Sequence, residues 1–154
     1  MTGSKTDPAT VQGLQGGAES LSAEALEAFL AREFPQMDYL DLRVEEVRTR
    51  HVRVRVPADD RHLRPGGTIA GPTMMALADC AVWLAIIATT GGNVEAVTTN
   101  LNINFLRRPP LKDLLAEADL LKLGRRLAVG EVGIFADGEP DPVAHATLTY
   151  ALPG

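Results

Sequence analysis

Apolar residues recur along this chain with two different periods, which divide it into helical and extended segments. Between residues 22 and 34 they recur every three or four positions, the pattern of a helix with one buried face. Ser22 can cap the first turn, Glu24 favours a helix N-terminus, and Pro35 stops the helix. The pattern therefore predicts an amphipathic helix near the N-terminus.

From residue 39 onward, apolar and polar residues mostly alternate, which is the period of a strand with one buried face. Two strands are predicted between Tyr39 and Val56, where apolar residues alternate with charged ones. Further strands follow residue 96, and residues that favour turns separate them. Their expected ranges are 97–105, 114–123, 127–136 and 143–152.

One segment is apolar on every side when it is arranged as a helix. It covers residues 72–90, with Pro72 in its first turn and Gly91 after its end, and we expect it to be buried all round. The order of elements predicts an α+β fold, an antiparallel sheet of about five to six strands wrapped around one central apolar helix, plus the N-terminal helix. One helix cannot cover both faces of such a sheet, so we also expect dimerisation.

Composition narrows the class of protein. The chain has 154 residues, of which 45% are hydrophobic and 23% charged, and its formal net charge is −5. We expect a mobile tail over residues 1–19 and a single domain over residues 20–154.

The acidic balance of the chain argues against nucleic acid as a partner. Without an apolar run of signal-peptide or membrane-spanning length, a cytoplasmic protein that binds no membrane is expected. Cys80 is the only cysteine, which excludes disulfides within the chain and zinc sites built on several thiolates.

Asp79 interrupts the apolar helix. It is the only charged residue between Arg64 and Glu95, and its neighbours one turn away include Met75 and Val82. An ionised carboxylate in such surroundings needs a partner, a hydrogen bond or a wet cleft. Two interpretations stay open. One is a structural ion pair or a cap on a loop, and the other, which we favour, is a general base in an active site.

Gly71 precedes the same helix, where backbone N–H groups and the positive end of the helix dipole suit a developing oxyanion. Glycine also lets a ligand approach the backbone closely. The alternative is that Gly66, Gly67 and Gly71 only shape a turn, and it fits the spacing equally well.

The segment around these residues resembles a known family. Its sequence is Arg64-Pro-Gly-Gly-Thr-Ile-Ala-Gly-Pro-Thr-Met-Met-Ala-Leu-Ala-Asp79. It is similar to the hotdog-fold thioesterase superfamily, in particular its phenylacetate-pathway (PaaI-like) type, whose pattern is roughly Asn-x-x-Gly-x-x-His-Gly-Gly followed by a helix with an acidic residue. The strand Thr98-Thr-Asn-Leu-Asn-Ile-Asn-Phe-Leu-Arg-Arg-Pro109 and the runs over residues 124–126 and 144–149 also fit. The resemblance covers residues 40–152 and implies the hotdog fold.

The resemblance also implies a reaction. In that family the helix acid, here Asp79, acts as general base or nucleophile on an acyl-CoA thioester. The N–H of Gly71 would stabilise the oxyanion, and Thr98 from the partner subunit would help to hold the attacking water. The implied assembly is a homodimer or a homotetramer, without metal or other cofactor. An acyl-carrier-protein thioester presents the same reacting bond and is a second candidate substrate.

Several more residues are candidates for substrate binding. Arginines bind phosphate by bidentate contacts, so those near strand ends suit the phosphates of CoA, although they are also ordinary solvated residues. These are Arg107, Arg108, Arg125 and Arg126. The other candidates lie in the matched segment or in the strand that follows it: Arg64, Gly67, Pro72 and Asn100.

The chain departs from the family pattern at three positions. Ala70 stands in place of the usual His, Arg64 in place of Asn, and Pro72 in place of the second Gly. These departures motivate two alternatives to a thioester hydrolase. One is a non-catalytic acyl-CoA or lipid-binding hotdog protein, and the other is a structural partner in a larger assembly. A dehydratase of this fold is not expected, because no histidine stands at the matching place.

The remaining residues with distinctive chemistry have structural interpretations. Trp83, Met74 and Met75 are expected to belong to the core, and Cys80 to pack beside them. His145, which alternates with alanines in the last strand, is expected to be a core or interface histidine.

Overall fold

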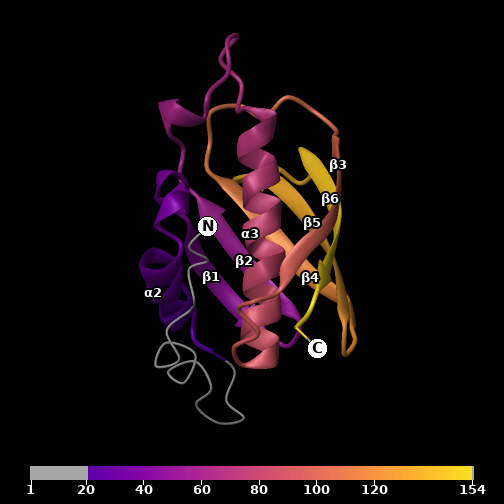
Figure 1. Ribbon diagram of the computed structural model, residues 1–154. Coiled ribbons are helices and arrows are strands. Elements are labelled where there is room, and N and C mark those ends of the chain that lie inside the picture. The colour runs from indigo at the N-terminus through magenta and orange to yellow at the C-terminus, as the bar shows by residue number, and fades with distance from the viewer. Residues whose placement is uncertain (1–20, 154) are drawn as a thin grey trace, which may run out of the picture.

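The computed structural model describes residues 21–153 and shows the predicted order of helices and strands (Figure 1). The tail expected over residues 1–19 lies outside this range. In chain order the elements are α2 (Ala23–Glu33), the 3₁₀ helix η1 (Pro35–Leu40), β1 (Arg43–Arg48), β2 (His51–Val56), the 3₁₀ helix η2 (Asp60–His62), α3 (Gly71–Thr90), β3 (Val97–Phe105), β4 (Leu114–Leu123), β5 (Leu127–Ala136) and β6 (Ala144–Ala151).

The six strands form one antiparallel sheet in the order β1-β2-β4-β5-β6-β3, and the sheet curves around α3 (Figure 1). The sheet residues beneath the helix are small or branched and fully buried, among them Ala116, Ala118 and Val132. A Cβ at Gly130 would lie 3.0 Å from Cγ1 of Val82, so the helix sits directly on the backbone of β5. This is the hotdog architecture, and the predicted fold class is confirmed.

The first helix is built as its sequence predicts, but the segment after it is not. The Oγ of Ser22 accepts a hydrogen bond from the N–H of Ala25 at 3.1 Å and caps α2. Residues 35–40 then form η1, so the prediction of a strand from Tyr39 onward is wrong and β1 begins at Arg43. The left-handed backbone of Asp41, with φ of 48°, ends η1 and redirects the chain into β1.

The central helix is less enclosed than predicted. Most of its side chains are buried, but Met75 is 40% exposed and Trp83 is partly exposed. The expectation of burial on all sides is therefore wrong, because the sheet and α2 leave part of the helix circumference open. By length and composition α3 could also cross a membrane, yet 67% of its most apolar stretch is buried inside this fold.

The two edge strands of the sheet differ in charge. On β1, Glu45, Glu46 and Arg48 make ion pairs, and charged edges resist pairing with another sheet. β3 has no charged residue, and its terminal apolar side chains, Val97 and Phe105, are 63% and 49% exposed. An uncharged edge with exposed apolar side chains is a surface that a second strand can join.

A bulge in β3 changes which of its side chains face α3. Thr98 pairs with Tyr150, whereas Asn100 pairs with Thr149, so Thr99 is the extra residue. In a regular strand, residues 98 and 100 would share one face. Because of the bulge, Thr98 faces the helix and Asn100 faces the outer side of the sheet.

Candidate active site

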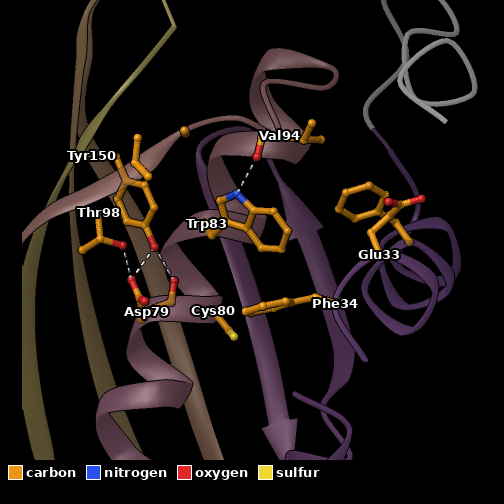
Figure 2. A pocket seen from close by; sticks show the side chains of 11 residues that line it. Glu33, Phe34, Asp79, Cys80, Trp83, Val94, Thr98 and Tyr150 are labelled. Carbon is orange, nitrogen blue, oxygen red and sulfur yellow. Dashed lines mark hydrogen bonds between the residues drawn. The ribbon is translucent and has the colours of Figure 1, made fainter. Parts of the chain in front are cut away.

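The carboxylate of Asp79 lies where α3, β3 and β6 meet (Figure 2). Its Oδ1 accepts hydrogen bonds from Oγ1 of Thr98, at 2.7 Å, and from the hydroxyl of Tyr150. Within residues 21–153 no cation and no backbone N–H contacts this carboxylate, and Oδ2 has no hydrogen-bond partner. Asp79 is therefore neither an ion-pair residue nor a loop cap in this part of the chain. Thr98 belongs to the same chain as Asp79, so the expectation that the partner subunit supplies it is wrong.

Tyr150 is the site residue that sequence reasoning missed. It is 2% exposed, and its hydroxyl also lies 2.8 Å from the backbone oxygen of Asp79. Burial and the adjacent Asp79 carboxylate raise the pKa of Tyr150, so the phenol stays protonated and acts as a donor. The alternation of β6 could have placed Tyr150 on the helix-facing side of the sheet. Its partner is 71 residues away in sequence, and no local pattern indicates that contact.

A pocket of about 260 Å³ opens beside Asp79. Aromatic rings form its opposite side: the centroids of Phe29 and Phe34 are 5.7 Å and 5.9 Å from that of Trp83. The indole Nε1 donates to the backbone oxygen of Val94 at 3.3 Å, which fixes the ring orientation (Figure 2). Trp83, predicted to be a core residue, instead lines this pocket. Met75, also predicted to be core, is exposed, whereas Met74 is buried as expected.

Cys80 lies beside the same pocket but is 5% exposed. Burial and the neighbouring Asp79 raise the pKa of its thiol to about 12. The group is therefore a neutral thiol near pH 7 and not an activated nucleophile, which agrees with the predicted packing role. In the part of the chain that the structure describes, no cluster of three or more His, Cys, Asp or Glu side chains could hold a metal ion.

Gly71 lies in a second pocket, of about 440 Å³, at the N-terminal end of α3. Its N–H has no hydrogen-bond partner within residues 21–153, and a Cβ at this position would lie 3.3 Å from the ring of Phe105. Asp79 follows eight residues later on α3, so a helix rise of about 12 Å separates the two residues. A single chain thus places Asp79 and Thr98 in one pocket and Gly71, the third predicted catalytic residue, in another.

Three of the predicted arginines line the second pocket. Arg107 donates from Nε to the backbone oxygen of Pro142 at 2.9 Å, and its Nη1 is 3.7 Å from Asp141. Arg64 and Arg108 have no acidic partner within the described range. Guanidinium groups beside a helix N-terminus suit phosphate or another anion.

The other predicted residues lie apart from Asp79. Gly67 has φ of 80° in the turn before α3, which supports the alternative that it shapes the turn. Pro72 is in the first turn of α3, and Arg125 is in the turn between β4 and β5. Asn100 pairs with Thr149 and faces the outer side of the sheet, away from the Asp79 carboxylate, so its role in substrate binding stays a prediction.

The fold places the chain in the hotdog class, and a carboxylate of its central helix opens to an aromatic pocket. Residues 66–143 match the family model of the thioesterase superfamily, and the chain belongs to this family. The prediction of a hotdog-fold, PaaI-like thioesterase is thereby confirmed.

Proteins from three organisms illustrate the relationship. A protein of Silicibacter sp. TM1040 that is assigned as a thioesterase is 40% identical, with a TM-score of 0.79 over 90% of this chain and 97% of that one. A variant of the phenylacetic acid degradation protein PaaI from Thermus thermophilus is 30% identical, with a TM-score of 0.67 over 76% and 97% of the two chains. A Halobacterium salinarum protein assigned as an esterase is 28% identical over an alignment of 138 residues, and the match covers 83% of this chain and 91% of its relative.

Proposed function

We propose that this thioesterase hydrolyses acyl-CoA thioesters and that Asp79 is its general base. The arrangement of the Asp79 carboxylate carries the proposal. Thr98 and Tyr150 hold Oδ1, while Oδ2 has no partner within residues 21–153. A carboxylate fixed in this way can orient a water molecule in the pocket and accept its proton through Oδ2.

The proposed reaction is a direct hydrolysis. The water oxygen bonds to the thioester carbonyl carbon while Oδ2 of Asp79 takes a proton, and the carbonyl oxygen becomes an oxyanion. The carbon–sulfur bond then breaks, and the departing thiolate takes the proton back from Asp79. The products are a carboxylic acid and a free thiol, and the carboxylate is restored. The oxyanion needs a hydrogen-bond donor, which a backbone N–H can provide.

We infer that this donor comes from a second copy of the chain. Asp79 contacts Thr98 near the start of β3, whereas Gly71 lines the same pocket as Phe105 at its end. If two copies pair antiparallel through β3 about a two-fold axis near Leu101, the start of one strand lies opposite the end of the other. The Gly71 N–H of the second copy then lies near Asp79 of the first. The uncharged, partly apolar edge of β3 supports such a homodimer.

The arginines support CoA as the thiol carrier. In the proposed dimer, the arginine-lined pocket of one copy adjoins the Asp79 pocket of the other. Arg125 precedes Leu127, which pairs with Ala151, and Ala151 pairs with Val97, so Arg125 belongs to the same end of the sheet as the Asp79 pocket. The phosphates of CoA match these guanidinium groups. An acyl-carrier-protein thioester remains the second candidate substrate, and we propose that the protein works in the cytoplasm.

Release of free thiol from short, medium, long and aromatic acyl-CoAs tests this function. We expect hydrolysis of at least one class, and Asp79→Asn should lower kcat by roughly 10²- to 10⁴-fold, the contribution of a general base. Asp60→Asn, which changes an exposed carboxylate of η2, is the matched control and should keep wild-type activity. Acyl-CoA binding without thiol release would contradict the proposal and favour the non-catalytic alternative.

A further inference from the structure

The pocket beside Asp79 contains a second carboxylate. Glu33, the last residue of α2, lines it on the other side of the Trp83 ring, as Figure 2 shows. The Glu33 side chain is 22% exposed, so the walls of the pocket shield it from most of the solvent. No Lys, Arg or His from residues 21–153 lines this pocket. Its charged groups are therefore two carboxylates at separate positions, with an aromatic surface between them.

The aromatic surface adds to the attraction of this pocket for positive charge. Phe29 and Phe34 both pack against Trp83, with centroid distances of 5.7 Å and 5.9 Å. The faces of aromatic rings attract ammonium groups, and a nearby carboxylate adds to that attraction. By contrast, an apolar ligand group placed beside Glu33 would remove water from the Glu33 carboxylate without replacing its hydrogen bonds. An anionic ligand group would be repelled.

Arg32 is the cation that contacts Glu33, and it does not remove the preference of the pocket for a positively charged group. Its Nε lies 3.5 Å from Oε1 of Glu33, but the Arg32 side chain is 56% exposed. An ion pair with such an exposed partner contributes little and is screened by solvent. Glu33 therefore keeps much of its capacity to bind a second cation from within the pocket.

We propose that the preferred acyl group of this thioesterase carries an ammonium group at its far end. This inference rests on the proposed function, because it places the thioester at Asp79. The acyl chain then runs along the Trp83 ring, and the ammonium group meets Glu33. Glu33 is accordingly a specificity-determining residue of the site.

A series of acyl-CoAs of increasing chain length tests the proposal, each made with a trimethylammonium, a tert-butyl or a carboxylate group at the far end. The first two groups have the same shape and differ in charge. At the chain length that fits, we expect kcat/KM to be about tenfold higher for trimethylammonium than for tert-butyl, a ratio typical of a partly desolvated cation–π contact. The carboxylate version should be the poorest substrate.

Glu33→Gln should reduce the trimethylammonium to tert-butyl ratio toward one. Glu95→Gln is the matched control, because Glu95 is an exposed carboxylate between two lining residues, Val94 and Ala96, but does not line the pocket. It should leave the ratio unchanged. A wild-type ratio of one or less, or a ratio that Glu33→Gln does not change, would overturn the inference while leaving the hydrolase function intact.

A binding measurement separates failure of the inference from failure of the proposed function. If no thioester is hydrolysed, non-hydrolysable amide analogues of the same series are titrated, and the fluorescence of Trp83, the only tryptophan, reports binding. Tighter binding of the trimethylammonium analogue to the wild type than to Glu33→Gln would support the assigned preference. Equal binding of the charged and neutral analogues would refute it.

Discussion

Two hydroxyl groups hold one oxygen of the Asp79 carboxylate, and the more buried of them belongs to Tyr150. Because its pKa is raised by burial and by the charge of Asp79, the phenol keeps its proton at neutral pH. A hydrogen bond to a charged acceptor contributes about 1.5–3 kcal/mol. We therefore interpret Tyr150 as a positioning residue that orients the proposed base without touching the substrate.

Tyr150→Phe tests this role. The variant keeps the ring but removes the donor, so we expect kcat to fall by roughly 10- to 100-fold if most of that hydrogen-bond energy orients the base. KM should change much less, since the hydroxyl donates its hydrogen bond to Asp79. Tyr39→Phe, at an exposed tyrosine, is the control and should behave as wild type. A Tyr150→Phe enzyme with unchanged kcat would refute the positioning role.

At the residue scale, the sequence indicates Asp79 because a charge interrupts an apolar helix, and this signal is local. The contact between Asp79 and Tyr150 is not local, so it depends on how β6 is placed beside α3. The alternation of β3 does not reveal the bulge at Thr99 either, and this bulge is the reason that Thr98 faces α3 while Asn100 faces the outer side of the sheet.

The contact between α3 and the sheet depends on a small residue at one point of β5. A Cβ at Gly130 would lie 3.0 Å from Cγ1 of Val82 and 3.3 Å from the backbone oxygen of Asp119. Val82 is fully buried and has little room to move. The close approach of helix and strand therefore requires glycine at this position.

Gly130→Ala should destabilise the protein by about 1–3 kcal/mol, the usual effect of forcing an extra methyl group into a packed core. Gly133→Ala is the matched control in the same strand. Its Cβ would meet the ring edge of Phe135, at 3.0 Å, and that partly exposed side chain can shift. Urea unfolding of both variants measures the difference. An equal or larger loss of stability in Gly133→Ala would contradict this view of the α3 contact.

At the element scale, the spacing of apolar residues and the residues that favour turns predict the order of helices and strands well. The main error is the strand predicted from Tyr39 onward. Leu40 and Leu42 are both buried, as a strand from Tyr39 would predict. Between them, Asp41 adopts the left-handed conformation, so a short 3₁₀ helix followed by a turn buries the same two side chains. Two conformations fit one alternating pattern, and the sequence does not distinguish them.

For the whole molecule, one chain does not contain the complete proposed site. Gly71 and Asp79 are close in sequence, and the matched family segment spans both, but the helix between them separates them by about 12 Å. Sequence spacing alone cannot show that two nearby motif residues act in different copies. The exposed edge of β3, which the fold leaves unpaired on one side, gives the reason to expect a shared site.

Substitutions at Gly71 test whether its backbone N–H is the oxyanion donor. Gly71→Pro removes the proposed oxyanion donor, and proline is tolerated at the first position of a helix. Ala70, with φ of −67° and ψ of 142°, already has a backbone suited to the residue before proline. We expect kcat to fall by roughly 10²- to 10³-fold, as for loss of one oxyanion donor. Gly71→Ala keeps the N–H and should retain most of the activity.

The most direct test is therefore the thioesterase activity of a purified heterodimer of Asp79→Asn and Gly71→Pro chains, each with its own affinity tag. In a shared site, Asp79 of the Gly71→Pro chain meets Gly71 of the Asp79→Asn chain, so one of two sites is intact and activity returns to about half that of the wild type. Each homodimer should stay nearly inactive. A heterodimer as inactive as the two homodimers would contradict a catalytic site shared between copies.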